Sequence, residues 1–144
     1  MKYLCLGYLD EAAWNGLSKS EQDALVAECF AFDEELTRAG HFVRGEALQN
    51  AGSATLRVRD GQVMVTDGPF AETKEQLGGL LVLEADDLDH AIQLMTKHPG
   101  VRIGPFEIHP IDEVFTAQAN ARRLEGASTP RTGGGGGPHA DTPT

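Results

Sequence analysis

The feature that most constrains the fold is the segment of residues 67–79, DGPFAETKEQLGG, which lies between two apolar stretches. Pro69 fixes its own φ angle and lacks an amide donor, and Gly68 permits left-handed backbone, so the preceding strand must end in a sharp turn. The pair Gly78 and Gly79 lets backbone or a ligand approach closely. This combination of turn formers, ionisable groups and glycines predicts a loop that holds a site.

Length and charge limit the classes of partner. Of 144 residues 40% are hydrophobic, and the apolar pattern predicts one domain over residues 1–118, followed by a flexible Gly-rich tail over residues 119–144. A formal net charge of −10 disfavours nucleic acid and an anionic membrane surface as partners. Because no stretch approaches twenty apolar residues and the N-terminus lacks a cleavable leader pattern, we expect a cytoplasmic protein.

Apolar periodicity predicts an α+β fold, a ferredoxin-like antiparallel sheet with two helices on one face and an inserted β-hairpin. Asp60-Gly61 is the strongest short-range hairpin signal, and it places Val58 opposite Val63. The helix-free face of such a sheet needs cover, and the usual cover is a second copy of the chain, so we expect a homodimer. The expected strands cover residues 2–9, 41–48, 55–59, 62–66, 80–84 and 103–109, and the expected helices cover residues 19–40 and 88–98.

Acid–base chemistry is one hypothesis for the segment of residues 67–79. Its carboxylates are close enough to shift one another's pKa, and Lys74 can keep one of them ionised, which makes Glu75 a candidate catalytic base. The alternative is a purely structural segment in which Asp67 forms an Asx-type turn. If the ends of the first two strands converge on this segment, the ligand-binding candidates are Tyr8, Glu46, Asp67, Glu72, Thr73, Lys74 and Gln76.

The last expected strand supplies a second pair of candidates. Glu107 and His109 alternate there, so they share one sheet face and form a possible catalytic acid–base pair. His98 is expected to be a pH-sensitive surface histidine at the end of the second helix, and the acidic residues of the first helix, including Asp33, are expected on a solvated face. Neither the five histidines nor the two cysteines show a metal-binding spacing, so we predict no metal and no cofactor.

The run DGPF followed by AETKEQLGG resembles the signature of the YCII-related, or DGPF, family of small bacterial proteins, and the resemblance covers residues 1 to about 114. It implies a dimeric α+β barrel, in which two sheets pack face to face. Some members of that family resemble lyases and dehydrochlorinases, with a catalytic histidine near the first helix and an aspartate near the end of the second. Because residues 19–40 contain no histidine and residues 95–100 no aspartate, the resemblance does not assign that pair here.

Two functions follow as hypotheses. The first is a cofactor-independent acid–base enzyme of the lyase or isomerase kind, acting on a small organic molecule, and it expects a pocket that holds a carboxylate. The second is a non-catalytic ligand-binding or regulatory module, which the family resemblance links to a sigma factor, and it expects an exposed patch besides the dimer face. The sequence leaves open the substrate, the reaction and whether the pocket lies within or between subunits.

Overall fold

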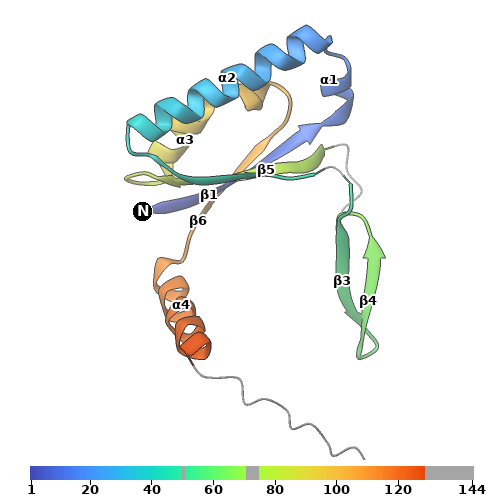
Figure 1. Ribbon diagram of the computed structural model, residues 1–144, viewed down its shortest axis with the longest axis vertical. Helices are drawn as coiled ribbons and strands as arrows, with labels where there is room; N and C mark the ends of the chain where they lie inside the picture. The colour runs from blue at the N-terminus through green and yellow to red at the C-terminus, as the bar shows by residue number, and fades with distance from the viewer. Residues whose placement is uncertain (50, 71–74, 129–144) are drawn as a thin grey trace, which may run out of the picture. The chain divides into compact units, whose positions relative to one another are not determined.

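The computed structural model describes residues 1–49, 51–70 and 75–128 and divides into two compact units, Met1–Ile111 and Asp112–Thr144 (Figure 1). The first unit contains a four-stranded sheet in the order β2-β5-β1-β6, in which every neighbouring pair is antiparallel. Helices α2 and α3 lie on the same side of this sheet (Figure 1), which confirms the predicted α+β architecture. The elements are β1 (Lys2–Asp10), α2 (Lys19–Arg38), β2 (Phe42–Ala47), β5 (Glu75–Glu84), α3 (Leu88–Thr96) and β6 (Phe106–Pro110).

Helix α2 begins and ends where its capping residues require. The Ser18 hydroxyl accepts a hydrogen bond from the Glu21 amide at 3.1 Å, and the Glu21 carboxylate accepts one from the Ser18 amide at 3.2 Å, which completes the predicted capping box. At the other end Gly40 adopts a φ of 81°, in the left-handed region that ends helices. Leu25 and Leu36 are buried against the sheet side, so the helix is held there by its apolar stripe.

The rest of the core lies between the sheet and the two helices. Cys5, Leu81 and Leu83 form one cluster with Leu36 and Met95, and Cys5 is fully buried. The short helix α1 (Glu11–Asn15) follows β1, and α3 leads into the 3-10 helix η1 (Pro99–Arg102). Among the described residues no helix has the length and apolar content needed to cross a membrane.

The predicted hairpin forms a separate two-stranded sheet. Strands β3 (Ala54–Arg59) and β4 (Gln62–Asp67) flank Asp60-Gly61, whose φ angles of 51° and 75° fit the expected turn. Val58 lies opposite Val63, as the sequence predicts. Gly68 then closes the open end of the hairpin, because it adopts a φ of 94° and its amide donates to the Ser53 carbonyl at 2.8 Å.

The largest differences from the prediction concern two segments. Strand β5 begins at Glu75, so residues 75–79 belong to a strand and not to a loop, because β1 continues to Asp10 and pairs Asp10 with Glu75. In the second unit, α4 (Glu113–Ser128) makes residues 119–128 helical where the sequence predicted a flexible tail. The helix is rich in good helix formers, and the Asp112 carboxylate accepts from the Phe115 amide at 2.9 Å, so local propensity and capping favour it without an apolar stripe.

Candidate functional site

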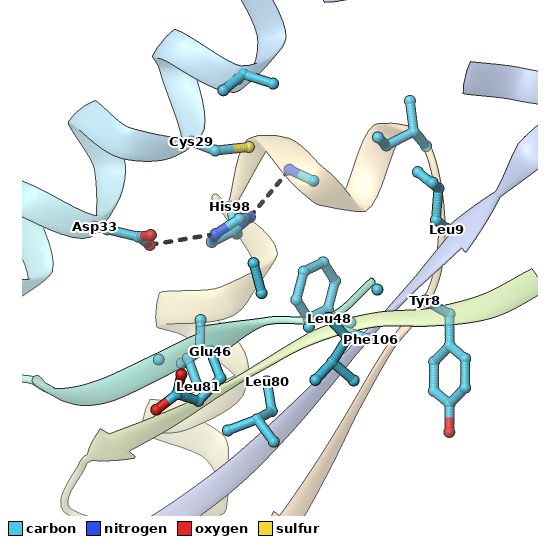
Figure 2. A pocket seen from close by; sticks show the side chains of 18 of the residues that line it. Tyr8, Leu9, Cys29, Asp33, Glu46, Leu48, Leu80, Leu81, His98 and Phe106 are labelled. Atoms are coloured by element: carbon cyan, nitrogen blue, oxygen red, sulfur yellow. Dashed lines mark hydrogen bonds and ion pairs between the residues drawn. The ribbon is translucent and has the colours of Figure 1, made fainter. Parts of the chain in front are cut away.

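A cavity of about 630 Å³ lies between α2 and the helix side of the sheet (Figure 2). Its floor is a row of small residues paired in register across three strands, in which Gly79 lies opposite both Gly7 and Ala47. Because these residues have little or no side chain, space remains beneath the helix. The apolar walls include Trp14, Leu25, Val26, Phe30, Phe42 and Phe106.

The glycines of the floor are required by their neighbours. A Cβ atom on Gly7 would lie 2.8 Å from the Phe106 ring, and one on Gly79 would lie 3.0 Å from the Glu46 carbonyl oxygen. Gly79 belongs to the segment of residues 67–79, so the predicted close approach at its double glycine is confirmed on the backbone of β2. The segment therefore shapes the cavity through a missing side chain.

His98 lies in the cavity wall and is 8% exposed. Its Nδ1 accepts a hydrogen bond from the Gly100 amide at 3.0 Å, so the neutral ring carries its proton on Nε2. That Nε2 lies 3.4 Å from Oδ1 of Asp33, and both interactions are drawn in Figure 2. The imidazole also contacts the Phe32 and Phe106 rings, with centroids 5.3 and 5.1 Å away, so its position is fixed by packing.

Asp33 places a carboxylate oxygen in the cavity without a fully formed hydrogen bond. Its Oδ1 is buried and makes no hydrogen bond to any of the described residues, although Nε2 of His98 lies 3.4 Å away. A buried acceptor in this state is uncommon in a folded protein and indicates a place for a ligand or a water molecule. The carboxylate can therefore accept a proton or a hydrogen bond from a molecule in the cavity.

Cys29 lies one helical turn before Asp33 and also lines the cavity. Burial, and then the negative charge of Asp33, raise the pKa of the Cys29 thiol, while Arg102 and the Gly100 amide act in the opposite direction. The group is therefore a thiol and not a thiolate at neutral pH, which makes it a poor nucleophile.

The predicted pair on β6 is brought together, but away from the His98–Asp33 pair. Nε2 of His109 lies 2.8 Å from Oε2 of Glu107, and Tyr8 lies beside the same carboxylate. Burial, followed by the charge of Glu107, raises the pKa of Tyr8. Although Tyr8 is a cavity-lining residue, Figure 2 shows its ring turned away from His98.

The other predicted site residues are dispersed. The Glu46 carboxylate pairs with Arg44 at 2.6 Å at the margin of the cavity. Glu75 and Gln76 lie on β5 opposite the end of β1, Asp67 ends β4, and these three are not among the described residues that line the cavity. Glu72, Thr73 and Lys74 lie outside the described residues, so the catalytic and ligand-binding roles assigned from sequence stay predictions.

Sequence reasoning missed Asp33 and His98, and one signal for Asp33 was present. Asp33 follows Cys29 by four residues and precedes Leu36 by three, so it lies in the apolar stripe of α2 and not on a solvated face. A carboxylate in a buried stripe needs a partner from elsewhere in the fold. His98 offered no such signal, because its burial depends on the path of η1 beneath α2.

No cluster of three His, Cys, Asp or Glu side chains suited to a metal ion occurs within residues 1–49, 51–70 and 75–128. Apart from Tyr8, whose ring turns away from His98, the titratable side chains among the described lining residues are Asp33, His98, Cys29 and Glu46. This set can move a proton and can hydrogen-bond a polar ligand.

Comparison with known proteins identifies the family. The sequence profile of the YCII-related domain matches residues 1–114. An uncharacterized protein of Rhizobium meliloti (strain 1021) is 33% identical over 116 residues, which are 77% of this chain and 92% of that protein. A solved structure of 5-chloro-2-hydroxyhydroquinone dehydrochlorinase from Burkholderia phenoliruptrix AC1100, in complex with 2,5-dihydroxybenzoquinone, is similar at 16% identity and a TM-score of 0.49, covering 78% of this chain and 94% of that one. The chain belongs to the YCII-related domain family.

Proposed function

We propose that this protein is an acid–base enzyme of the lyase or isomerase type, in which Asp33 and His98 act on a small organic molecule in the cavity beneath α2. One observation carries the proposal: the buried Oδ1 of Asp33 lacks a fully formed hydrogen bond, while His98 beside it is held in a single tautomer. A carboxylate and an imidazole in a cleft are the usual pair for proton transfer.

The hydrogen bond to His98 indicates which of the two residues accepts the proton. Because Nδ1 of His98 is occupied by the Gly100 amide, His98 presents only its Nε2–H, and Asp33 is the proton acceptor. Asp33 takes a proton from a carbon next to a carbonyl group of the ligand, and the C–H electron pair forms a C=C bond as the carbonyl π pair moves onto oxygen. When the oxygen pair re-forms the carbonyl, the proton can return to a different carbon as a conjugated double bond shifts, which completes an isomerisation. Alternatively, a leaving group on the β-carbon departs with its electron pair, which completes an elimination.

The lining defines the ligand class. The volume of about 630 Å³ lies within the range of roughly 300–1,000 Å³ that small-molecule sites occupy. The described lining is mainly apolar and aromatic, and its charged side chains are the carboxylates of Asp33 and Glu46. Such a lining favours a neutral or weakly acidic organic molecule over one that carries several negative charges.

We also propose that the protein works as a homodimer in the cytoplasm. Leu4, Leu6, Leu80 and Val82 alternate with the core residues of β1 and β5, so they face the side of the sheet opposite α2 and α3. An apolar sheet face of this kind needs cover, and a second copy supplies it in a symmetric pair. Both cysteines are free, which fits a reducing compartment.

The alternative function is a non-catalytic ligand-binding or regulatory module. The observation that favours it is a second exposed apolar surface, on the hairpin, where Leu56 and Val58 are 67% and 73% exposed. An exposed apolar surface of this kind is suited to a protein partner. The link to a sigma factor rests on the family resemblance alone.

Proton exchange in D₂O tests the enzymatic proposal without knowledge of the full reaction. Wild type, Asp33→Asn and the matched control Glu35→Gln, an exposed acid on the same helix, are incubated with a panel of lactones, phenols and small organic acids. Binding is followed by thermal shift, because a ligand that binds only the folded state raises Tm. Loss of carbon-bound protons is followed by NMR.

The proposal expects a panel member that stabilises the wild type and loses a carbon-bound proton. Asp33→Asn should slow this exchange at least about a hundredfold, the usual contribution of a positioned base, and Glu35→Gln should leave it unchanged. Binding without exchange in the wild type supports the binding module instead. Equal exchange rates in wild type and Asp33→Asn would remove Asp33 from the mechanism.

A further inference from the structure

We propose that the β3–β4 hairpin, residues 54–67, is a dimerisation arm that packs its apolar face on a second copy of the chain. This inference rests on the homodimer proposed above and is independent of the proposed chemistry. An isolated two-stranded hairpin is only marginally stable in water, so an exposed hairpin needs a surface to pack against.

One face of the arm is almost entirely apolar. Cross-strand pairing sets Leu56 opposite Val65 and Val58 opposite Val63, so the four side chains share one face. They are 62–73% exposed within the single chain. Four adjacent aliphatic side chains form a patch of the kind that marks a protein interface, because leaving them in water is unfavourable.

The opposite face of the arm is different. Met64 lies opposite Arg57 there, and the Arg57 guanidinium lies 4.4 Å from the centroid of the Phe70 ring. This face is therefore polar and partly occupied by the DGPF segment. The difference between the two faces makes the apolar face the docking surface and supplies a control within the same hairpin.

The net charge of the arm is compatible with a second copy of the chain as its binding partner. Within residues 54–67 two arginines balance two aspartates, so the arm is neutral while the whole chain carries a formal charge of −10. Two copies that met through their acidic surfaces would repel each other, whereas the apolar face of a neutral arm can pack on a second acidic copy without that repulsion.

The position of the arm also favours a second copy of the chain as its binding partner. The arm follows directly from β2 and leads into β5, and Figure 1 shows it extending on the side of the sheet away from α2 and α3. The arm therefore extends on the side of the first unit to which the helix-free sheet face belongs. A twofold pair would cover this sheet face and the apolar face of the arm at once, and each copy would contribute the same patches.

The test compares two neighbouring substitutions on opposite faces, Val63→Glu and Met64→Glu. Both introduce the same charge into β4 at an exposed position. Position 64 lies opposite Arg57 and position 63 lies opposite Val58, so the stability of each folded variant is measured alongside its mass. Mass is measured by sedimentation equilibrium between about 1 and 100 µM, a range in which stable homodimers form. Far-UV circular dichroism and Tm confirm that both variants fold.

The expected result is a wild-type dimer whose Kd rises at least about tenfold in Val63→Glu, because an unpaired charge is desolvated in the interface, and changes less than about threefold in Met64→Glu. A wild-type monomer at 100 µM would overturn both the homodimer and the arm, and would leave the apolar face to a different protein. A dimer that Val63→Glu leaves intact, or that both variants weaken equally, would overturn the arm alone.

Discussion

Nη2 of Arg102 lies 2.6 Å from Oε2 of Glu28, which joins the 3-10 helix η1 to helix α2 across 74 residues of sequence. The two elements carry the two members of the candidate dyad, because His98 caps η1 and Asp33 lies on α2. Both side chains of the ion pair are about half exposed or more. The pair is therefore a surface clamp beside the cavity and not part of the core.

Arg102→Ala should weaken ligand binding more than it weakens the fold. An exposed ion pair contributes less than about 1 kcal/mol to stability, so the free energy of unfolding should fall only slightly. Loss of the clamp lets η1 shift against α2, which lengthens the distance between His98 and Asp33. Urea unfolding and thermal-shift titration with any panel ligand measure the two effects, and Arg122→Ala on α4 is the control.

Cys29 offers a direct readout of charge in the cavity. Its thiol pKa is raised above the ordinary value of 9.0, first by burial and then by Asp33, and is lowered by Arg102. Alkylation by iodoacetamide should therefore be slow at pH 8, and its rate should still be rising steeply with pH at pH 9, because the thiol pKa lies above 9.0. Asp33→Asn removes a negative charge and should speed the reaction at pH 8, whereas Arg102→Ala should slow it.

The alkylation experiment needs one precaution. Cys5 is fully buried and its pKa is raised to about 11, so it should not react in the folded protein, but a Cys5→Ala background removes any doubt about the site of modification. Mass spectrometry after digestion locates the label. If the Asp33→Asn and Arg102→Ala rates shift in the same direction, the assigned electrostatic causes are incorrect.

His98→Ala should cost about 2–4 kcal/mol of stability, because it leaves a void between two aromatic rings and removes the cap of η1. His98→Asn should cost less, since its side-chain oxygen can still accept from the Gly100 amide. Urea unfolding of both variants measures the difference. Equal losses would mean that packing alone holds the ring.

Gly104→Ala should destabilise the chain by about 1–3 kcal/mol through overpacking. A Cβ atom at Gly104 would clash with the carbonyl oxygen of Tyr8, which is backbone and has little freedom to move. Gly126→Ala is the control for a glycine without steric restriction, because a Cβ atom at that helical position meets nothing within 4 Å, and it should be neutral or slightly stabilising. An unfolding curve of Gly104→Ala equal to that of the wild type would show that β1 moves easily.

Much of the fold could be predicted because its signals are local. The capping box at Ser18, the turn at Asp60-Gly61 and the alternation on β6 each depend on a few neighbouring residues, and all three are confirmed. The start of β5 could not be predicted, because it depends on how far β1 extends and therefore on a partner distant in sequence. Helix α4 was missed because its residues show no apolar stripe.

The candidate site was harder to predict for the same reason. The sequence predicted the site in the charged segment of residues 67–79. The described part of that segment contributes Gly78 and Gly79 to the cavity and no charged side chain. Asp33 and His98 are 65 residues apart and meet only through packing of η1 beneath α2. Spacing within one element cannot reveal such a pair.

Because the cavity floor is the row of Gly7, Gly79 and Ala47, the size of the cavity and its ionisable groups depend on different parts of the fold. The strands determine the depth of the cavity, through the side-chain volume at three paired positions. The helical elements supply its ionisable groups, Asp33 and His98. A larger residue at Ala47 would shorten the compartment without touching the candidate proton-transfer groups, whereas a Cβ atom at Gly7 or Gly79 would first press on the Phe106 ring or the Glu46 carbonyl. Selection for molecular size and selection for reactivity can therefore proceed on different layers of the same small fold.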